Sequence, residues 1–261
     1  EKNGIFGRKL EVQNIFKGIE SIACTFGFSG IEPNTVLMDW PGETKDPVWF
    51  KDMTEKLISL DYNVLYLDYD ERWGFRKKEK IDLWWRGFGN NAELMLSLAK
   101  FITSSPDWSQ ANIRILLAND TNVDFKVVEN RIRSVVEQFR VKAEIKVINN
   151  EVDQKPIYDL MKMHSSEADL VFVGIPEILP NERQEFVERT NNLVGVIGTT
   201  LLVKASSQFE ETDLKLEQIA LKHEPLKVEQ TELVELVASA DQSLYGAMVD
   251  LDTRLDGLIT E

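Results

Sequence analysis

The chain has 261 residues, 43% hydrophobic and 28% charged, which predicts a folded globular protein with room for one large domain or two lobes. Its formal net charge of −14 argues against nucleic acid or anionic lipid as a partner of the whole domain. No window approaches the roughly 18 uncharged apolar residues of a membrane span, so we expect no direct membrane insertion by this chain. It begins at Glu1 without a methionine or a signal peptide, and we expect it to be a fragment of a longer protein.

The first predicted unit is an α/β lobe over residues 1–79. Apolar residues recur at helical spacing over Leu10–Phe28, and glycines end this helix. Thr35–Trp40 and Asn63–Asp68 read as buried strands. Between them, the pair Asp46-Pro47 predicts the start of a second helix, with the aspartate as N-cap and proline in the first turn.

Residues 70–80 (DERWGFRKKEK) are polar and charged, so we interpret them as a connector and as the boundary between two lobes. The second predicted lobe, residues 80–206, alternates strands with helices. Such alternation predicts a mostly parallel sheet with helices on both faces. The predicted strands are Ile81–Trp85, Asn112–Ala118, Ala143–Ile148, Asp169–Gly174 and Thr199–Lys204, and the predicted helices are Ala92–Thr103, Asp124–Arg140, Pro156–His164 and Asn181–Val194.

Residues 207–261 form an acidic tail with 13 acidic and 4 basic residues. A long helix is expected over Glu232–Ile259, because apolar residues recur there at nearly heptad spacing. Two interpretations stay open: the helix packs on its own domain, or it packs on a partner chain. The apolar positions are Leu233, Val237, Ala240, Leu244, Ala247, Leu251, Leu255 and Leu258.

A glycine-rich turn, Gly87-Phe88-Gly89, follows the strand Ile81–Trp85 and precedes Asn90 and Asn91. Turns between a strand and a helix often hold phosphates in α/β proteins. The third glycine of the dinucleotide-binding pattern is absent here. We therefore interpret this segment as a tight turn that lets the backbone leave the strand, and we expect Asn90 to cap the helix.

The other loops at the carboxyl ends of the predicted strands are mostly acidic or neutral. They contain Asp39 with Trp40, Asp68 with Asp70, residues 119–121 and residues 174–177. Asp39 and Asp120 could together hold a divalent cation, but two exposed carboxylates at loop ends are commonplace. We predict no metal site, no cofactor and no catalytic residue.

Cysteine and histidine are too scarce for most catalytic sites. Cys24, the single cysteine, excludes intramolecular disulfides and cysteine-cluster metal sites, and its apolar surroundings predict a buried, unreactive thiol. The two histidines, His164 and His223, lie in no catalytic motif, and neither a nucleophile elbow nor HExxH occurs. The chain is therefore not expected to be an enzyme.

All six tryptophans lie between Trp40 and Trp108. Such aromatic clusters usually bury surface between elements or lobes. Trp84 and Trp85 are adjacent on a predicted strand, so they should point to opposite faces of the sheet. We expect one to face a helix layer and the other to face the first lobe or a partner.

Five segments in the same order resemble the cytoplasmic C-terminal domain of cation–chloride cotransporters. The resemblance covers about residues 9–206, and its most specific part is the strand with the tryptophan pair. The segments are PNTVLM (Pro33–Met38) after FGFSG, IDLWW (Ile81–Trp85), DWSQANIRILLA (Asp107–Ala118), ADLVFVGIPEILPNE (Ala168–Glu182) and TTLLVKAS (Thr199–Ser206).

This resemblance implies a regulatory, homodimeric domain on the cytoplasmic side of the cell membrane, attached to a transport domain that moves chloride with sodium or potassium. It also implies lobes distantly similar to universal stress proteins. Those proteins have a glycine-rich ATP loop after a strand similar to ADLVFVG. Here Pro176 and Pro180 remove amides, and Glu177 adds negative charge, so the resemblance implies that this loop is lost. The acidic tail and the GFGNN turn depart from the cotransporter pattern.

The leading hypothesis is therefore a non-catalytic regulatory and dimerisation domain of a cation–chloride cotransporter. One alternative is a free-standing nucleotide-binding stress-type sensor, with ATP near Asp39, Asp120 and Gly174. A second is a small α/β hydrolase or transferase that uses loop carboxylates. For the dimer, the helix Glu232–Ile259 and the tryptophan-rich segment are the expected surfaces.

Overall fold

The computed structural model describes residues 11–25, 33–41, 47–87, 89–119 and 124–206. The chain divides into two compact units, Glu1–Gln218 and Ile219–Glu261, and all described residues belong to the first. The predicted tail helix, Asp120 and His223 lie outside the described residues, as does Phe88 within the glycine-rich turn.

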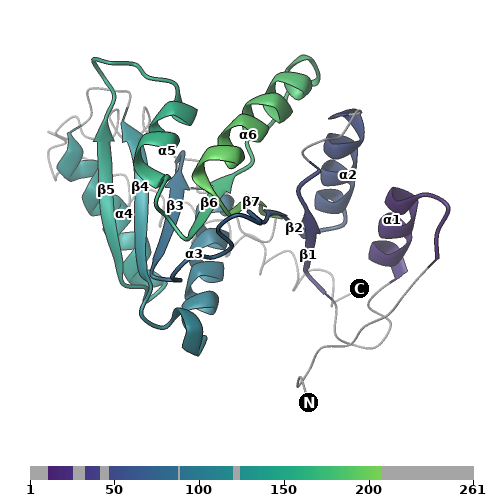
Figure 1. Ribbon diagram of the computed structural model, residues 1–261, viewed down its shortest axis with the longest axis horizontal. Coiled ribbons are helices and arrows are strands. Elements are labelled where there is room, and N and C mark those ends of the chain that lie inside the picture. Colours follow the sequence, from purple (N-terminus) through teal and green to yellow (C-terminus); the bar gives the residue numbers. More distant parts are fainter. Residues whose placement is uncertain (1–10, 26–32, 42–46, 88, 120–123, 207–261) are drawn as a thin grey trace, which may run out of the picture. The chain divides into compact units, whose positions relative to one another are not determined.

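The described strands form one seven-stranded sheet in the order β1-β2-β7-β6-β3-β4-β5 (Figure 1). Neighbouring strands are parallel except β2 and β7, which are antiparallel. The predicted mostly parallel α/β fold is thus confirmed. The strands are β1 (Thr35–Asp39), β2 (Asn63–Asp68), β3 (Lys80–Trp85), β4 (Asn112–Asn119), β5 (Ala143–Asn149), β6 (Leu170–Gly174) and β7 (Thr200–Lys204).

Helices cover both faces of this sheet. The apolar residues of α2, α5 and α6 join one core cluster with alternate residues of the strands. α3 and α4 contact the strands without joining that cluster, which places them on the other face. The described helices are α1 (Ile15–Thr25), α2 (Pro47–Ser59), α3 (Asn90–Thr103), α4 (Phe125–Gln138), α5 (Ile157–Ser165) and α6 (Arg183–Ile197), with short 3-10 turns η1 (Pro106–Trp108) and η2 (Pro180–Glu182).

The strands assigned to two lobes belong to a single sheet. β7 returns beside β2, where Leu65 pairs with Val203 and Val64 with Lys204. A second lobe with a sheet of its own is therefore not seen in the described residues. The reason is a long-range antiparallel pairing, which joins strands on the two sides of the predicted boundary.

The tryptophan pair belongs to the core. Trp84 and Trp85 are each 3% exposed, and only Trp84 joins the cluster under α5 and α6, which confirms that the two rings point to opposite faces. Trp40 and Trp108 are also buried, whereas Trp73 is 47% exposed. Trp85 therefore does not face a partner, and these four buried rings do not provide the expected dimer surface.

The expectation of a buried thiol is wrong, because Cys24 is exposed on α1. Only Gly18 and Ala23 of this helix are buried, so its apolar stripe covers less of the core than the sequence pattern predicts. Ile15 is 62% exposed on the same helix.

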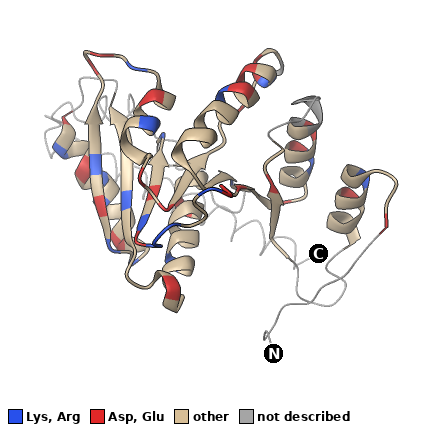
Figure 2. Cartoon of the chain, in the orientation of Figure 1, with Lys and Arg blue, Asp and Glu red and all other residues tan. Residues whose placement is uncertain are grey.

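The two edge strands differ in charge. β5 carries Glu144 and Lys146 in its middle, whereas the middle of β1, Val36–Met38, has no charged residue (Figure 2). Charged side chains on an edge strand oppose pairing with another chain. The edge at β1 lacks this protection.

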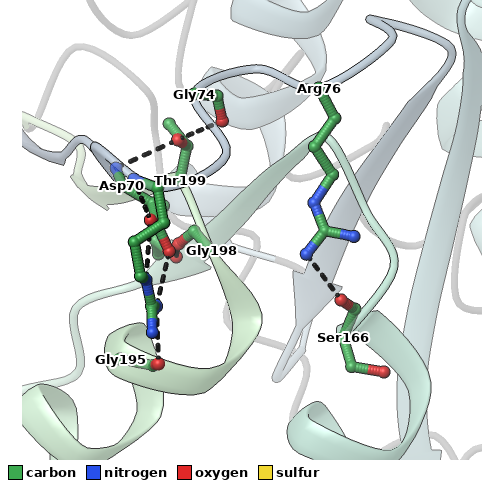
Figure 3. A network of polar contacts seen from close by, with 9 residues as sticks. Asp70, Gly74, Arg76, Ser166, Gly195, Gly198 and Thr199 are labelled. Carbon is green, nitrogen blue, oxygen red and sulfur yellow. Dashed lines mark hydrogen bonds and ion pairs between the residues drawn. The ribbon is translucent and has the colours of Figure 1, made fainter.

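The connector between β2 and β3 is fastened to the rest of the fold (Figure 3). Thr199 donates a hydrogen bond to the carbonyl oxygen of Gly74 (2.7 Å) and accepts one from the amide of Asp70 (3.2 Å). Arg76 donates to the carbonyl oxygen of Ser166 (3.0 Å). The predicted interlobe connector is therefore a fixed loop against the start of β7 and the end of α5.

Candidate functional site

A crevice of about 540 Å³ lies at the carboxyl ends of β3, β6 and β7. After β3 the chain proceeds outward to β4 and β5, then returns to β6 on the other side of β3. Ligands of open α/β sheets bind at such a change of direction. Apolar side chains from α3, α5 and α6 line the crevice together with Arg86, Glu177 and Lys204, so this is the candidate functional site.

The glycine-rich turn enters this crevice, and its two asparagines hold it in place. Asn91 accepts a hydrogen bond from the amide of Ala205 (2.8 Å) and donates one to the carbonyl oxygen of Ile175 (3.1 Å). Asn90 donates to the carbonyl oxygen of Ser206 (3.2 Å). The asparagines thus connect the start of α3 to the ends of β6 and β7.

The prediction that Asn90 caps α3 is wrong. The N-cap position is taken by Gly89 in an extended conformation, without a side-chain capping bond. Asn90 is the first residue of the helix, and its side-chain amide is directed to Ser206 instead. A distant backbone acceptor has replaced the local role that sequence patterns predict.

Gly174 allows Asn91 to reach the end of β6. A Cβ atom at this glycine would lie 3.2 Å from the amide nitrogen of Asn91 and 3.2 Å from the terminal methyl of Met95. Both contacts are tighter than ordinary van der Waals packing. The glycine at the end of β6 therefore serves close packing on α3.

The loop after β6 offers little to a phosphate group. The amide of Ile175 donates to the carbonyl oxygen of Val203 (2.8 Å), and Pro176 has no amide hydrogen. Glu177 then places a carboxylate on the rim. Phosphate sites need free amides and positive charge, so Arg86 and Lys204 provide the only favourable contribution among the described charged residues of the crevice.

A buried polar network beside the crevice was missed at the sequence level. Asp82 is fully buried in β3, and its oxygens accept hydrogen bonds from Nε and Nη2 of Arg114 on β4 at 2.7 and 2.6 Å. Ser165, at the end of α5, donates to Asp82 (2.6 Å) and accepts from the indole of Trp84 (2.8 Å). A charged residue inside the apolar strands IDLWW and NIRILLA was the available signal, because a buried charge needs a partner.

His164 lies at the edge of this network. Its Nδ1 is 3.2 Å from Nζ of Lys146, and its carbonyl oxygen accepts a hydrogen bond from Arg114 (3.0 Å). Burial lowers the pKa of His164 below its ordinary value of 6.5, and the charges of Lys146 and Arg114 lower it further. The ring is therefore neutral at physiological pH, and it does not line the crevice.

The predicted acidic residues do not gather at the crevice. β1 and β2 run antiparallel to β7. The carboxyl ends of β1 and β2, with Asp39 and Asp68, therefore lie at the opposite ends of the strands from Gly174 and from Asn119 at the end of β4. Topology thus separates Asp39 from any residue that follows β4 or β6. Among the described residues, no three histidine, cysteine, aspartate or glutamate side chains lie close enough to hold a metal ion.

Asp68 and Asp70 are close in the sequence, and their pKa values are shifted in opposite directions. Burial, and next the charge of Asp70, raise the pKa of Asp68. The hydrogen bond from Arg72 holds the pKa of Asp70 below its usual value. Arg72 also donates to the carbonyl oxygen of Gly195 (2.9 Å), so this pair fastens the connector rather than lining the crevice.

Within the described part of the chain, no helix has the length and apolar character that a membrane crossing requires. No protein-family model matches the sequence, and no curated protein matches it. Solved structures do resemble the fold. One is the cytoplasmic domain of a prokaryotic cation chloride cotransporter, with 16% identity, a TM-score of 0.52, and coverage of 80% of this chain and 73% of that chain.

A universal stress protein from Archaeoglobus fulgidus DSM 4304 is also similar, with 11% identity, a TM-score of 0.47, and coverage of 74% of this chain and 66% of that chain. The structural resemblance to a cotransporter cytoplasmic domain that the sequence led us to expect is thus found, at low sequence identity. The likeness to the cotransporter domain is one of fold.

Proposed function

We propose that this chain is a non-catalytic cytoplasmic regulatory and dimerisation domain of a cation–chloride cotransporter. The fold likeness to such a domain, over 80% of the chain, supports this proposal. The observation that carries the non-catalytic part is the state of the crevice. An enzyme of this architecture would bind its substrate at the carboxyl ends of β6 and β7. Here the side chains of Asn90 and Asn91, which follow the glycine-rich turn, bond to the backbone at these ends and connect α3 with them.

The charges of the crevice also favour a scaffold. Its described charged residues are Arg86, Glu177 and Lys204, without a histidine or a pair of carboxylates for acid–base chemistry. The described polar network around Asp82 is buried and joins β3, β4 and α5. Such a network stabilises an arrangement of strands and helices.

The reading frame upstream of Glu1 provides the direct test. We expect roughly a dozen apolar spans of about 20 residues each, because the transport domain would precede this domain in the same chain. A start codon a few residues upstream would instead give a free-standing protein. That result would contradict the proposal.

Homodimerisation is part of the proposal, because paired domains would connect two transport subunits. The tail offers one surface, although it lies outside the described residues. If its heptad positions form the contact, charged substitutions of Leu244 and Leu251 should give monomers in sedimentation velocity. A dimer that persists unchanged would exclude the tail as the interface.

A nucleotide-binding sensor is the second candidate. The position of the crevice at the change of strand direction favours it, together with Arg86 and Lys204 on the crevice wall. Calorimetry with Mg-ATP tests this function: it predicts binding that Arg86→Ala weakens and that Arg133→Ala, on the distant α4, leaves unchanged. Absence of heat at millimolar nucleotide would exclude it.

A further inference from the structure

The backbone of β1 has an open hydrogen-bonding edge. The amide of Trp40 donates to the carbonyl oxygen of Leu67 (2.8 Å), and the carbonyl oxygen of Asn34 accepts from the amide of Asn63 (2.8 Å). Even-numbered residues of this segment therefore direct their N–H and C=O groups toward β2. Directions alternate along a strand, so the odd-numbered residues direct theirs away from the sheet.

These outward residues are Thr35, Leu37 and Asp39, and no described strand pairs with β1 on that side. The three are symmetric about Leu37. If a second β1 approaches antiparallel about a two-fold axis, Leu37 pairs with Leu37 of the second copy, and Thr35 pairs with Asp39. No like charges lie opposite each other, so this edge is complementary to itself.

We propose that two copies of this chain pair through their β1 edges, with the two Leu37 residues at the two-fold axis. This inference rests on the proposed dimerisation function and assigns its interface. The other edge of the sheet is protected by Glu144 and Lys146 on β5, whereas Val36–Met38 carries no charge (Figure 2). A lysine on an edge strand opposes pairing with another chain, so we assign the pairing to β1.

The side chain of Leu37 supports the same arrangement. It is 60% exposed, whereas Val36 and Met38 pack against the core cluster. Pairing would bring the two exposed leucines together across the axis. A strand of five residues buries little area, so we expect a reversible dimer with a Kd of about micromolar.

Sedimentation velocity of the full chain, from micromolar to millimolar concentration, tests the pairing. Leu37→Pro removes the outward N–H groups at the axis and leaves the bonds from β1 to β2 intact, because prolines are tolerated on edge strands in this position. We expect the Kd to rise by about tenfold or more. Ile145→Pro is the matched control. The amide of Asn150 donates a hydrogen bond to the carbonyl oxygen of Asn119 on β4 (3.0 Å), so the amide of the odd-numbered Ile145 faces outward at the β5 edge.

A cross-linking measurement does not depend on the proline variant folding. In a Cys24→Ser background, Leu37→Cys should form a disulfide dimer under mild oxidation, because hydrogen-bonded antiparallel partners have Cα atoms about 5.5 Å apart. Ile145→Cys in the same background should not. Equal cross-linking of the two variants would overturn the proposal.

The outcomes separate this inference from the proposed function. A dimer that Leu37→Pro leaves unchanged would overturn the β1 interface and keep dimerisation through another surface. A wild-type chain that remains monomeric at every concentration would overturn both the interface and the dimerisation function. Neither result would bear on the upstream transport domain, which the reading frame tests.

Discussion

The carboxylate of Asp82 and the guanidinium of Arg114 lie opposite each other on neighbouring strands, with two hydrogen bonds of 2.7 and 2.6 Å between them. The aspartate side chain is fully buried and that of the arginine is 14% exposed. Burial alone would lower the pKa of Arg114, but the hydrogen bond and charge of Asp82 outweigh it and raise that pKa. The guanidinium of Arg114 therefore remains charged inside the fold.

Asp82→Asn should lower the free energy of unfolding by about 3–5 kcal/mol, because it leaves the arginine charge without its buried partner. Urea denaturation measures the change. Glu129→Gln, which removes one member of the exposed Glu129–Arg133 pair, is the control and should change stability by less than about 0.5 kcal/mol. Replacement of both buried charges, Asp82→Leu with Arg114→Met, should cost less than Asp82→Asn alone. Near wild-type stability of Asp82→Asn would contradict this prediction.

His164 should make stability depend on pH below about 6.5. Its pKa is lowered in the folded chain, so the unfolded chain binds the proton first as pH falls. The contribution is fully present above the unfolded pKa and is lost as pH decreases toward the folded pKa. An NMR titration should give a midpoint below 6.5 for His164, and His164→Gln should flatten the pH dependence of unfolding. A midpoint at or above that value would contradict the inference that burial and the charge of Lys146 lower the pKa of His164.

Asn91→Ala should lower the free energy of unfolding by about 1–3 kcal/mol, because the amide of Ala205 and the carbonyl oxygen of Ile175 both lose a partner. Hydrogen exchange gives a local measurement: the amide of Ala205 should exchange faster in the variant. Asn112→Ala is the matched control, since its side chain is exposed and bonds to Glu144 at 3.3 Å. Equal stability changes in the two variants would show that Asn91 does not hold the turn.

Local sequence patterns predicted most elements well. β2 (Asn63–Asp68) has the predicted bounds, because a buried apolar run is delimited by polar residues. The helix expected from Asp124 is found as α4, with Asp124 as its N-cap; the carboxylate accepts a hydrogen bond from the amide of Lys126 (2.8 Å). The expected helix Leu10–Phe28 is shorter in the described residues, since Asn14 accepts bonds from two amides of the first turn of α1. A local capping residue was available but not recognised.

Long-range contacts explain what the sequence did not reveal. The pairing of β2 with β7 brings residues far apart in sequence together, and no local pattern specifies it. The same pairing places Asp39 and Gly174 at opposite ends of the strands, whereas the sensor hypothesis expected them near one ATP site. The use of Asn90 and Asn91 likewise depends on the ends of β6 and β7. The candidate site could therefore be located by its turn, but its contents required the topology.

Asp169 should control the connector between β2 and β3. Its carboxylate accepts hydrogen bonds from the amides of Lys77, Glu79 and Lys80 at 3.3, 2.6 and 2.8 Å, and it is 5% exposed. Arg76 and Lys78 have positive φ angles, 41° and 60°, which orient successive amides toward one anion. These strained conformations persist because the hydrogen bonds to the buried carboxylate of Asp169 stabilise them.

Asp169→Ala should therefore release this loop, and trypsin should cleave after Arg76 and Lys77 much faster than in the wild type. Asp107→Ala is the control, because it removes only the ion pair with Lys78, and the side chain of Asp107 is 69% exposed. Urea denaturation of both variants distinguishes local release from global unfolding. Cleavage that increases only in proportion to the loss of global stability would mean that the loop is held by Thr199 and Arg76 rather than by Asp169.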